Sequence, residues 1–149
     1  MLVDSHPSLV LCAFDSKRVI GDIQSTKDLL KDSLILAKTT GISSDKIVLD
    51  PAIGFFRKSG KGSFFTKIKS DWLERDLSVI QNLKSIKMQY PVLISVSNKS
   101  FIGKLLGKEN VSDRLFGSIS AEVVSVLNGA DIIRTHNVAQ TKDAIVIAS

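Results

Sequence analysis

Four short runs rich in Val, Ile and Leu recur along the chain at similar intervals, and each predicts a β-strand. Apolar and polar positions hardly alternate within a run, which is typical of strands buried on both faces of a parallel sheet. Segments with apolar residues at helical spacing separate these runs. The expected strands cover residues 9–14, 46–50, 91–96 and 131–135, and the expected helices cover residues 28–40, 72–87, 114–128 and 141–148.

The regular alternation of strand and helix indicates an α/β fold in which right-handed crossovers connect parallel strands. Ser25 and Asp71 are candidate N-caps of the first two helices, and Gly129 is a candidate C-cap of the third. Two architectures are compatible with this order: a small doubly wound sheet, or part of a (β/α)₈ barrel. The 149 residues contain no linker or low-complexity tract, and we expect one domain over residues 1–149.

Composition narrows the class of protein. The chain is 44% hydrophobic and 23% charged, which is ordinary for a globular protein. No apolar run approaches the about 20 residues of a membrane-spanning helix, and we expect no membrane partner. Cys12 is the one cysteine, which excludes an intrachain disulfide, and no spacing of His or Cys predicts a metal ligand. We read no secretory signal near Met1 and expect a cytoplasmic protein.

The charge balance points to an anionic partner. Twenty basic and 15 acidic residues give a net charge of +5, which suits a phosphate, a carboxylate or a nucleic acid. Residues 57–69 hold five basic and no acidic residues, and a solvated basic loop is the simplest interpretation of that run. Since no RNA-recognition, zinc-finger or helix-turn-helix signature is present, we expect no nucleic-acid partner.

Polar residues suited to chemistry follow three of the expected strands. Asp50 closes the second strand, Ser97 and Lys99 follow the third, and Arg134 and His136 follow the fourth. In parallel α/β proteins the loops after the strands build the active site. We therefore expect these five side chains to meet at one rim of the fold.

The pair after the fourth strand suits a phosphate or diphosphate. Side chains at i and i+2 of an extended segment lie on the same side, so Arg134 and His136 would offer convergent hydrogen-bond donors. The structural alternative is an ion pair between Arg134 and either Asp131 or Asp143.

The segment after the second strand suits a planar ring. A carboxylate at Asp50 matches the paired N–H groups of an amino-pyrimidine edge, Gly54 would admit a ligand close to the backbone, and Phe55 could pack on a ring. The structural alternative is a turn aspartate before Pro51, followed by a turn glycine and a core phenylalanine.

Four segments, taken in order, resemble the dihydropteroate synthases, the pterin-binding barrel enzymes of folate synthesis. They are residues 47–55 (IVLDPAIGF), 96–103 (VSNKSFIG), 114–121 (RLFGSISA) and 134–138 (RTHNV). Each segment alone is a weak signal, but four in order over about 90 residues are specific. The resemblance implies a pterin-binding domain that forms a (β/α)₄ half of a TIM barrel with parallel strands, corresponding to the last four β-α units.

The resemblance implies a transferase that condenses a hydroxymethyl-dihydropterin diphosphate with 4-aminobenzoate, with Mg²⁺ accompanying the diphosphate. Asp50 would bind the amino-pyrimidine edge of the pterin, and Lys99 would contact the ring oxygen and nitrogen. Ser97 would lie near the aminobenzoate carboxylate and Phe55 near its ring.

Arg134 would flank the pterin and, with His136, hold the diphosphate. The catalytic residues implied are Lys99, Arg134 and His136. The substrate-binding residues implied are Asp50, Gly54, Phe55, Ser97, Lys99, Arg134 and His136.

This sequence also departs from the family pattern. Asn98 stands where the family usually has Arg, and Ala52 and Phe56 replace glycines. A whole (β/α)₈ barrel needs about 250 residues. The resemblance therefore implies a fragment, one half of a split protein, or a half-barrel that pairs with a missing N-terminal half or a second copy. We expect weak or no pterin binding by the chain alone.

Two other functions stay open. A pterin-dependent methyltransferase would keep the aspartate of the second strand but needs no diphosphate site, so the pair Arg134 and His136 favours the synthase. A non-catalytic half-barrel that serves as an assembly scaffold would tolerate Lys99→Ala and Arg134→Ala without loss of function.

Overall fold

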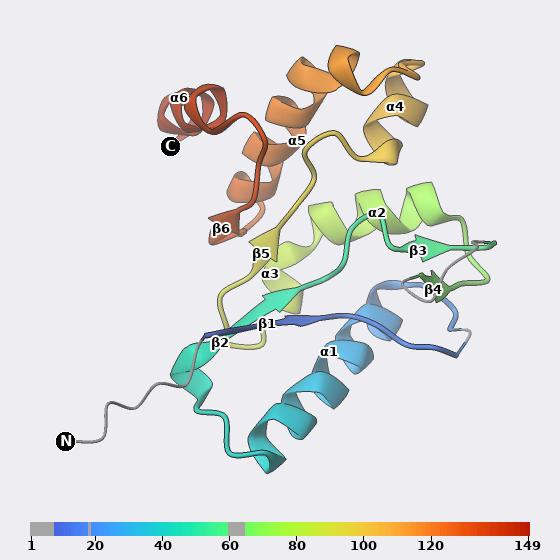
Figure 1. Ribbon diagram of the computed structural model, residues 1–149, viewed down its shortest axis with the longest axis vertical. Helices are drawn as coiled ribbons and strands as arrows, with labels where there is room; N and C mark the ends of the chain where they lie inside the picture. Colours follow the sequence, from blue (N-terminus) through green and yellow to red (C-terminus); the bar gives the residue numbers. More distant parts are fainter. Residues whose placement is uncertain (1–7, 18, 60–64) are drawn as a thin grey trace.

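Four parallel strands form the centre of the computed structural model, which describes residues 8–17, 19–59 and 65–149 (Figure 1). β1 pairs with β2 and β5 pairs with β6, and a bridge between Leu49 and Val92 joins the two pairs. Each strand therefore neighbours the next one along the chain. The expected α/β fold with parallel strands is confirmed. The strands are β1 (Leu9–Cys12), β2 (Ile47–Asp50), β5 (Leu93–Ile94) and β6 (Ile132–Ile133).

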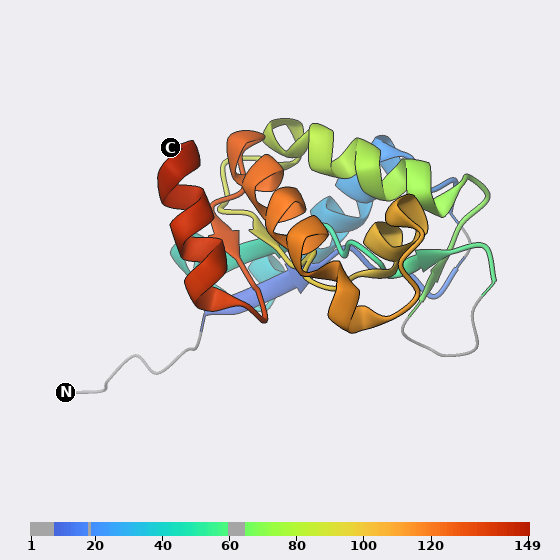
Figure 2. The ribbon, with the colours of Figure 1, turned by 90° about the horizontal axis from the view of Figure 1, so that it is seen from above.

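Helices follow each of these strands. They are α1 (Ile23–Thr39), α2 (Trp72–Gln81), α3 (Leu83–Ile86), α4 (Ser100–Leu106), α5 (Leu115–Leu127) and α6 (Val138–Ala148). Figure 2 shows α1, α2 and α5 on the same side of β1 and β2. A second parallel pair, β3 (Phe56–Arg57) and β4 (Thr66–Lys67), lies in the connection after β2. Among the helices described, none combines the length and apolar character needed to cross a membrane.

The core lies between the strands and the helices that flank them. Leu30 of α1, Leu49 of β2, Val79 of α2 and Ile94 of β5 are fully buried. Each buried side chain of this kind contributes about 1.5–3 kcal/mol to folding. This packing fixes the strand ends from which the polar side chains project.

The boundaries differ from the sequence prediction in instructive ways. The prediction of Ser25 as the first N-cap is wrong, because the Asp22 carboxylate accepts a hydrogen bond from the Ser25 N–H (2.7 Å) and α1 begins earlier. Asp71 caps α2 as expected. The expected helix over residues 72–87 is divided at Asn82, and α4 was not expected. Residues 60–64 of the basic run lie outside the described residues.

Candidate active site

The connection after β2 folds into a tight turn that presents Asp50 and Phe55. The Asp50 carboxylate accepts a hydrogen bond from the Ala52 N–H (2.7 Å), and the Phe55 N–H donates to the Ala52 carbonyl (3.1 Å). Ala52 and Gly54 both have positive φ angles, +57° and +85°, which reverse the chain sharply. The Phe55 ring stays 41% exposed, so it is not a core phenylalanine.

Lys99 reaches over this turn from the connection between β5 and α4. Its Nζ lies 4.2 Å from the centre of the Phe55 ring. A Cβ at Gly54 would lie 3.0 Å from Cδ of Lys99. The close approach that Gly54 permits is therefore made, in this structure, by the lysine side chain.

Asp50, Lys99 and Arg134 share one electrostatic environment. Burial raises the pKa of the Asp50 carboxyl, and the charges of Lys99, Arg75 and Arg134 oppose that rise. Burial lowers the pKa of the Lys99 ammonium, and the charges of Asp50 and Asp76 oppose that fall. Of the three positive charges, Arg134 has the weakest influence on Asp50. These charges, which come from the connections after β2, β5 and β6, influence one another.

Ser97 and His136 tie the third strand end to the fourth. The imidazole Nδ1 of His136 lies 3.0 Å from Ser97 Oγ, and the His136 backbone N–H donates to the same oxygen (3.3 Å). Ser97 is 3% exposed, so its hydroxyl is enclosed beside the imidazole. This contact orients the His136 ring at the rim.

Arg134 follows β6 and is exposed. Its backbone N–H donates to the Ile94 carbonyl (2.9 Å), which continues the alignment of β5 with β6. Asp131, one structural partner considered for Arg134, instead pairs with Lys87 (2.6 Å) and accepts from the Val92 N–H (2.8 Å). The ion pair of Arg134 with Asp131 that the sequence offered as an alternative is therefore not the arrangement of Asp131 in this structure.

A buried ion pair that the sequence did not suggest supports the turn after β2. Arg75 and Asp76 of α2 are both buried, and Arg75 Nη1 lies 3.0 Å from Asp76 Oδ1. Asp76 accepts from the Gly54 N–H (3.1 Å), and Arg75 donates to the carbonyls of Pro51 and Ala52.

A second buried network supports the segment after β6. Glu122 of α5 is fully buried and accepts from the Thr141 hydroxyl (2.6 Å). Thr141 Oγ1 lies 3.1 Å from Thr135 Oγ1, which accepts from the Asn137 N–H (3.1 Å). Thr135, which lies between Arg134 and His136, is therefore held against α5 and α6.

Two of the departures from the family pattern, Phe56 and Asn98, contact other residues of the chain. Phe56 is fully buried, with the Arg75 guanidinium 3.6 Å from its ring centre. The Asn98 N–H donates to Ser118 Oγ (2.9 Å), and the Ser118 hydroxyl lies 3.3 Å from Asn98 Oδ1. Both residues are therefore engaged in contacts within the protein.

The described residues do not fit a protein-built magnesium cage, since they contain no group of three or more His, Cys, Asp or Glu that could hold a metal ion. The charged neighbours of the Asp50 carboxyl are cations, which bind phosphate oxygens directly. We assign no step of the chemistry to a metal held by this chain.

Comparison with known proteins places this arrangement in a family. The family model for pterin binding enzymes matches residues 15–136. Dihydropteroate synthase of Neisseria meningitidis is 37% identical over 109 residues, which is 72% of this chain and 34% of the relative. A dihydropteroate synthase from Coxiella burnetii, solved with pteroic acid, has a TM-score of 0.75 at 37% identity. That match covers 94% of this chain and 50% of the other.

A dihydropteroate synthase from Thermus thermophilus, solved with 4-aminobenzoate, has a TM-score of 0.69 at 28% identity and covers 85% of this chain and 45% of the other. The chain thus spans between a third and a half of the length of these relatives. The family match, the identity and the shared fold agree: the chain belongs to the pterin binding enzymes, and its relatives are dihydropteroate synthases.

Proposed function

We propose that this chain supplies one half of a dihydropteroate synthase, a transferase that condenses a hydroxymethyl-dihydropterin diphosphate with 4-aminobenzoate to give dihydropteroate and diphosphate. The observation that carries this proposal is the meeting of three strand ends, because Lys99 Nζ lies 4.2 Å from the centre of the Phe55 ring and His136 Nδ1 lies 3.0 Å from Ser97 Oγ. The pteroic acid and 4-aminobenzoate held by relatives support this class of ligand.

The chain's own groups match the two ends of the pterin substrate. The ionised Asp50 carboxylate would accept two N–H groups from the amino-pyrimidine edge, and Lys99 would donate to the ring oxygen and nitrogen. Phe55 would pack near the aminobenzoate ring, with Gly54 keeping the backbone close and Ser97 near the carboxylate end. Each charge-assisted hydrogen bond contributes about 1.5–3 kcal/mol.

The chemistry requires a leaving group to depart before a weak nucleophile attacks. The methylene–oxygen bond breaks, its electron pair leaves with the diphosphate, and positive charge develops on the pterin methylene. The aminobenzoate nitrogen then bonds to that carbon and gives its proton to diphosphate or water. Arg134 and His136 would neutralise the departing anion, and positioning supplies the rest of the rate. Magnesium bound to the diphosphate would enter with the substrate.

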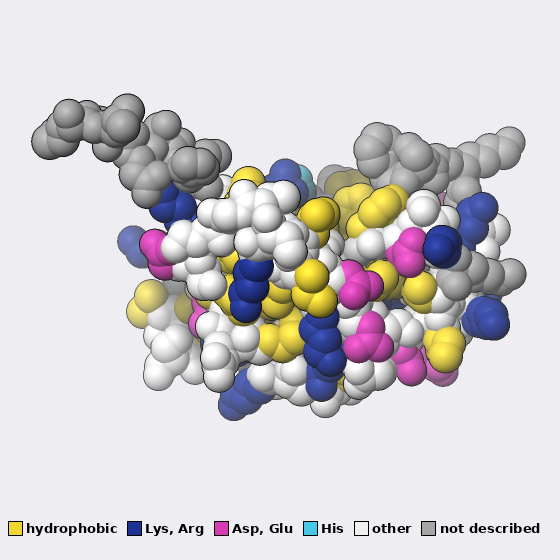
Figure 3. Space-filling view, turned by 90° about the horizontal axis from the view of Figure 1, so that it is seen from below, with side chains coloured by type: hydrophobic (Ala, Val, Ile, Leu, Met, Phe, Trp, Pro, Cys, Tyr) yellow, Lys and Arg dark blue, Asp and Glu magenta, His cyan; other side chains and the backbone are white. Residues whose placement is uncertain are grey.

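The half-barrel part of the proposal rests on the two edges of the strand layer. We infer that residues 1–149 form the last four β-α units of a (β/α)₈ barrel, because the four strands neighbour one another in chain order. A groove of about 390 Å³ lies between β1 and α1, lined by Val10, Leu36 and Ile42 among others. Figure 3 views the α1 side and shows apolar side chains among charged ones.

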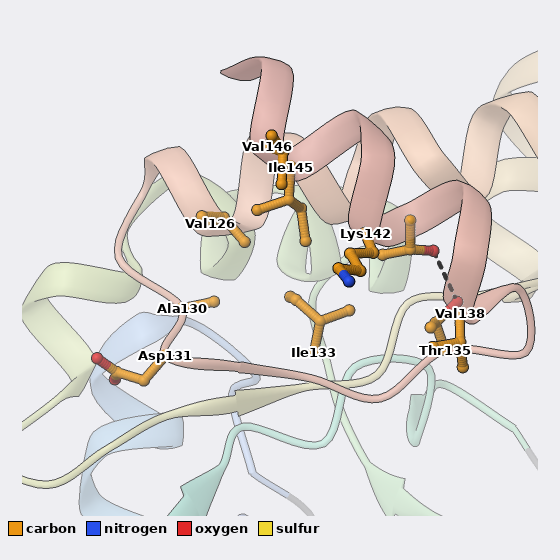
Figure 4. A pocket seen from close by; sticks show the side chains of 10 residues that line it. Val126, Ala130, Asp131, Ile133, Thr135, Val138, Lys142, Ile145 and Val146 are labelled. Carbon is orange, nitrogen blue, oxygen red and sulfur yellow. Dashed lines mark hydrogen bonds between the residues drawn. The ribbon is translucent and has the colours of Figure 1, made fainter. Parts of the chain in front are cut away.

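The opposite edge carries a matching feature. A groove of about 380 Å³ lies beside β6 and beneath α6, where Ile133, Val138 and Ile145 line it (Figure 4). In a closed barrel, the neighbouring β-α units pack at these two edges. The proposed partner is therefore an N-terminal half-barrel, with a second copy of this chain as the alternative. A cytoplasmic location belongs to the same proposal.

The test pairs residues 1–149 with the N-terminal half of the Neisseria meningitidis synthase, a combination termed the reconstituted protein here. We expect labelled 4-aminobenzoate to enter dihydropteroate, with activity lost in Lys99→Ala and Arg134→Ala and kept in Lys87→Ala, which lies in an exposed ion pair. Product from methylated folate alone would instead favour a methyltransferase. Equal activity in all variants would favour a scaffold.

A further inference from the structure

One helix holds the turn that presents Asp50 through contacts at three main-chain positions. From α2, Arg75 donates to the carbonyl oxygens of Pro51 and Ala52. Asp76, its neighbour, accepts from the Gly54 N–H (3.1 Å). These contacts lie on the main chain of the turn, in which the Asp50 carboxylate also accepts a hydrogen bond from the Ala52 N–H.

The two helical residues are themselves fixed from several directions. Arg75 donates to Thr26 Oγ1 on α1 (3.0 Å), and its guanidinium lies 3.6 Å from the centre of the Phe56 ring. The Arg57 guanidinium lies 3.8 Å from Asp76 and 4.2 Å from the centre of the Trp72 ring. A planar guanidinium with this many partners sets the orientation of what it holds, which a flexible ammonium would do less well.

We propose that Arg75 and Asp76 are positioning residues for ligand binding, which fix the turn after β2 so that the Asp50 carboxyl group meets the planar edge of its ligand. The identity of that ligand, a pterin, rests on the proposed function. Neither residue touches the ligand, and both act through the main chain and charge of the turn.

The electrostatics of the turn agree with this role. The groups that face Asp50 are the Ala52 N–H, the charges of Lys99, Arg75 and Arg134, and the Cys12 thiol on β1. Burial raises the pKa of Asp50, and the positive charge of Arg75 is one of the three that lower it. Removing that charge therefore raises the pKa of Asp50 further.

The test uses nuclear magnetic resonance on the labelled full chain. Two quantities are measured: the hydrogen exchange rate of the Gly54 amide and the pKa of the Asp50 carboxyl. The variants are Asp76→Ala, which removes the acceptor, Asp76→Asn, which keeps one, Arg75→Gln, which removes the charge, and Arg75→Lys, which keeps it. Val79→Ala on the same helix is the control for lost stability alone, because Val79 is buried in the core.

We expect Gly54 exchange to be at least about tenfold slower in the wild type than in an unstructured peptide. It should rise by about tenfold in Asp76→Ala and by no more than about threefold in Asp76→Asn, which retains an acceptor oxygen. Arg75→Gln should raise the pKa of Asp50 by about half a unit or more, whereas Arg75→Lys should leave it within about 0.2 units.

Fast Gly54 exchange in the wild type would overturn the proposal, even where the variants do not fold. The proposal would also be overturned if Val79→Ala raised Gly54 exchange as much as Asp76→Ala does. It would likewise be overturned if Arg75→Gln left the pKa of Asp50 unchanged.

Saturation-transfer spectroscopy of the reconstituted protein with 6-hydroxymethylpterin tests the ligand separately, since it detects weak binding. Expected responses at Gly54 and Asp50 without any pterin contact would refute the proposed function and leave the positioning role standing. If pterin contact is seen but the variants leave Gly54 exchange and the Asp50 pKa unchanged, the positioning role is refuted and the proposed function stands.

Discussion

The Lys99 ammonium lies 4.2 Å from the centre of the Phe55 ring, and the stem of the same side chain covers Gly54. Side chains from two strand ends that are far apart in the sequence are therefore in direct contact. A cation over an aromatic face is attracted by the ring quadrupole, and partial burial strengthens that attraction. The ring and the ammonium together form the wall against which we expect the aromatic substrate to pack.

Phe55→Leu removes the ring and keeps apolar bulk. A cation–π contact at a partly exposed site contributes about 0.5–1 kcal/mol. We therefore expect the KM of the reconstituted protein for 4-aminobenzoate to rise about two- to fivefold. Phe65→Leu is the control, because the Phe65 ring lies 6.2 Å from that of Phe55 and is its neighbour. A KM that changes only in the control would contradict the assignment.

Gly54→Ala should do more damage than Gly41→Ala, although the two glycines have nearly the same φ, +85° and +82°. A Cβ at Gly54 would lie 3.0 Å from Lys99 Cδ, whereas a Cβ at Gly41 would meet nothing within 4 Å. Both variants carry the backbone strain of about 1 kcal/mol, and only Gly54→Ala displaces the lysine. Urea unfolding measures the loss of stability that the two variants share. The condensation activity of the reconstituted protein should fall in Gly54→Ala alone. Equal activity in the two variants would mean that the lysine can move freely.

Asp50→Asn should stabilise the fold at neutral pH. Burial raises the pKa of the Asp50 carboxyl above its value in the unfolded chain. The folded chain therefore keeps this proton up to a higher pH than the unfolded chain does. The free energy of unfolding falls as pH rises from the unfolded-state pKa to the folded-state pKa, and it stays lower at any pH above both. The variant should therefore unfold at higher urea concentration than the wild type at pH 7, and the difference should shrink at pH 3. It should also lose about ten- to a hundredfold in pterin affinity, because charge-assisted bonds are lost. Equal unfolding midpoints at pH 7 would contradict the account.

Thr141→Val should destabilise the chain through Glu122. The hydroxyl of Thr141 donates to the buried carboxyl, whose other oxygen has no hydrogen-bond partner among the described residues. Removing the donor leaves a buried polar group unsatisfied, which costs about 1–3 kcal/mol. Glu122→Leu combined with Thr141→Val should recover much of this loss, since an apolar pair needs no donor. Thr39→Val, at an exposed hydroxyl on α1, serves as the control. A double variant less stable than Thr141→Val would refute this reading.

The sequence predicted the groups at the strand ends because chain direction alone decides where they lie. Asp50, Lys99 and Arg134 each follow an apolar run, and parallel strands bring their carboxyl ends to one edge. The first N-cap was misplaced because Asp22 and Ser25 are both good caps three residues apart. The seven-residue helix α4 was not found because so few turns give little periodicity.

The buried Arg75–Asp76 pair was beyond sequence reasoning for a different reason. Adjacent charges on a helix usually lie on a solvated face, and the sequence does not say which carbonyls a guanidinium will meet. One signal was present: Asp76 lies on the helical face that also carries Val79, Ile80 and Leu83. A carboxylate in an apolar stripe requires a hydrogen-bond or ionic partner when it is buried, so its position predicts a buried polar contact at this helix.

In the proposed function, Asp50 holds the pterin end and Arg134 the diphosphate end of one substrate. Calorimetry of the reconstituted protein with hydroxymethylpterin diphosphate and with hydroxymethylpterin tests it directly. We expect the wild type to bind the diphosphate compound more tightly, Arg134→Ala to lose that preference, and Asp50→Asn to bind both compounds weakly. An Arg134→Ala variant that keeps the full preference, or an Asp50→Asn variant that binds both compounds like the wild type, would contradict the account.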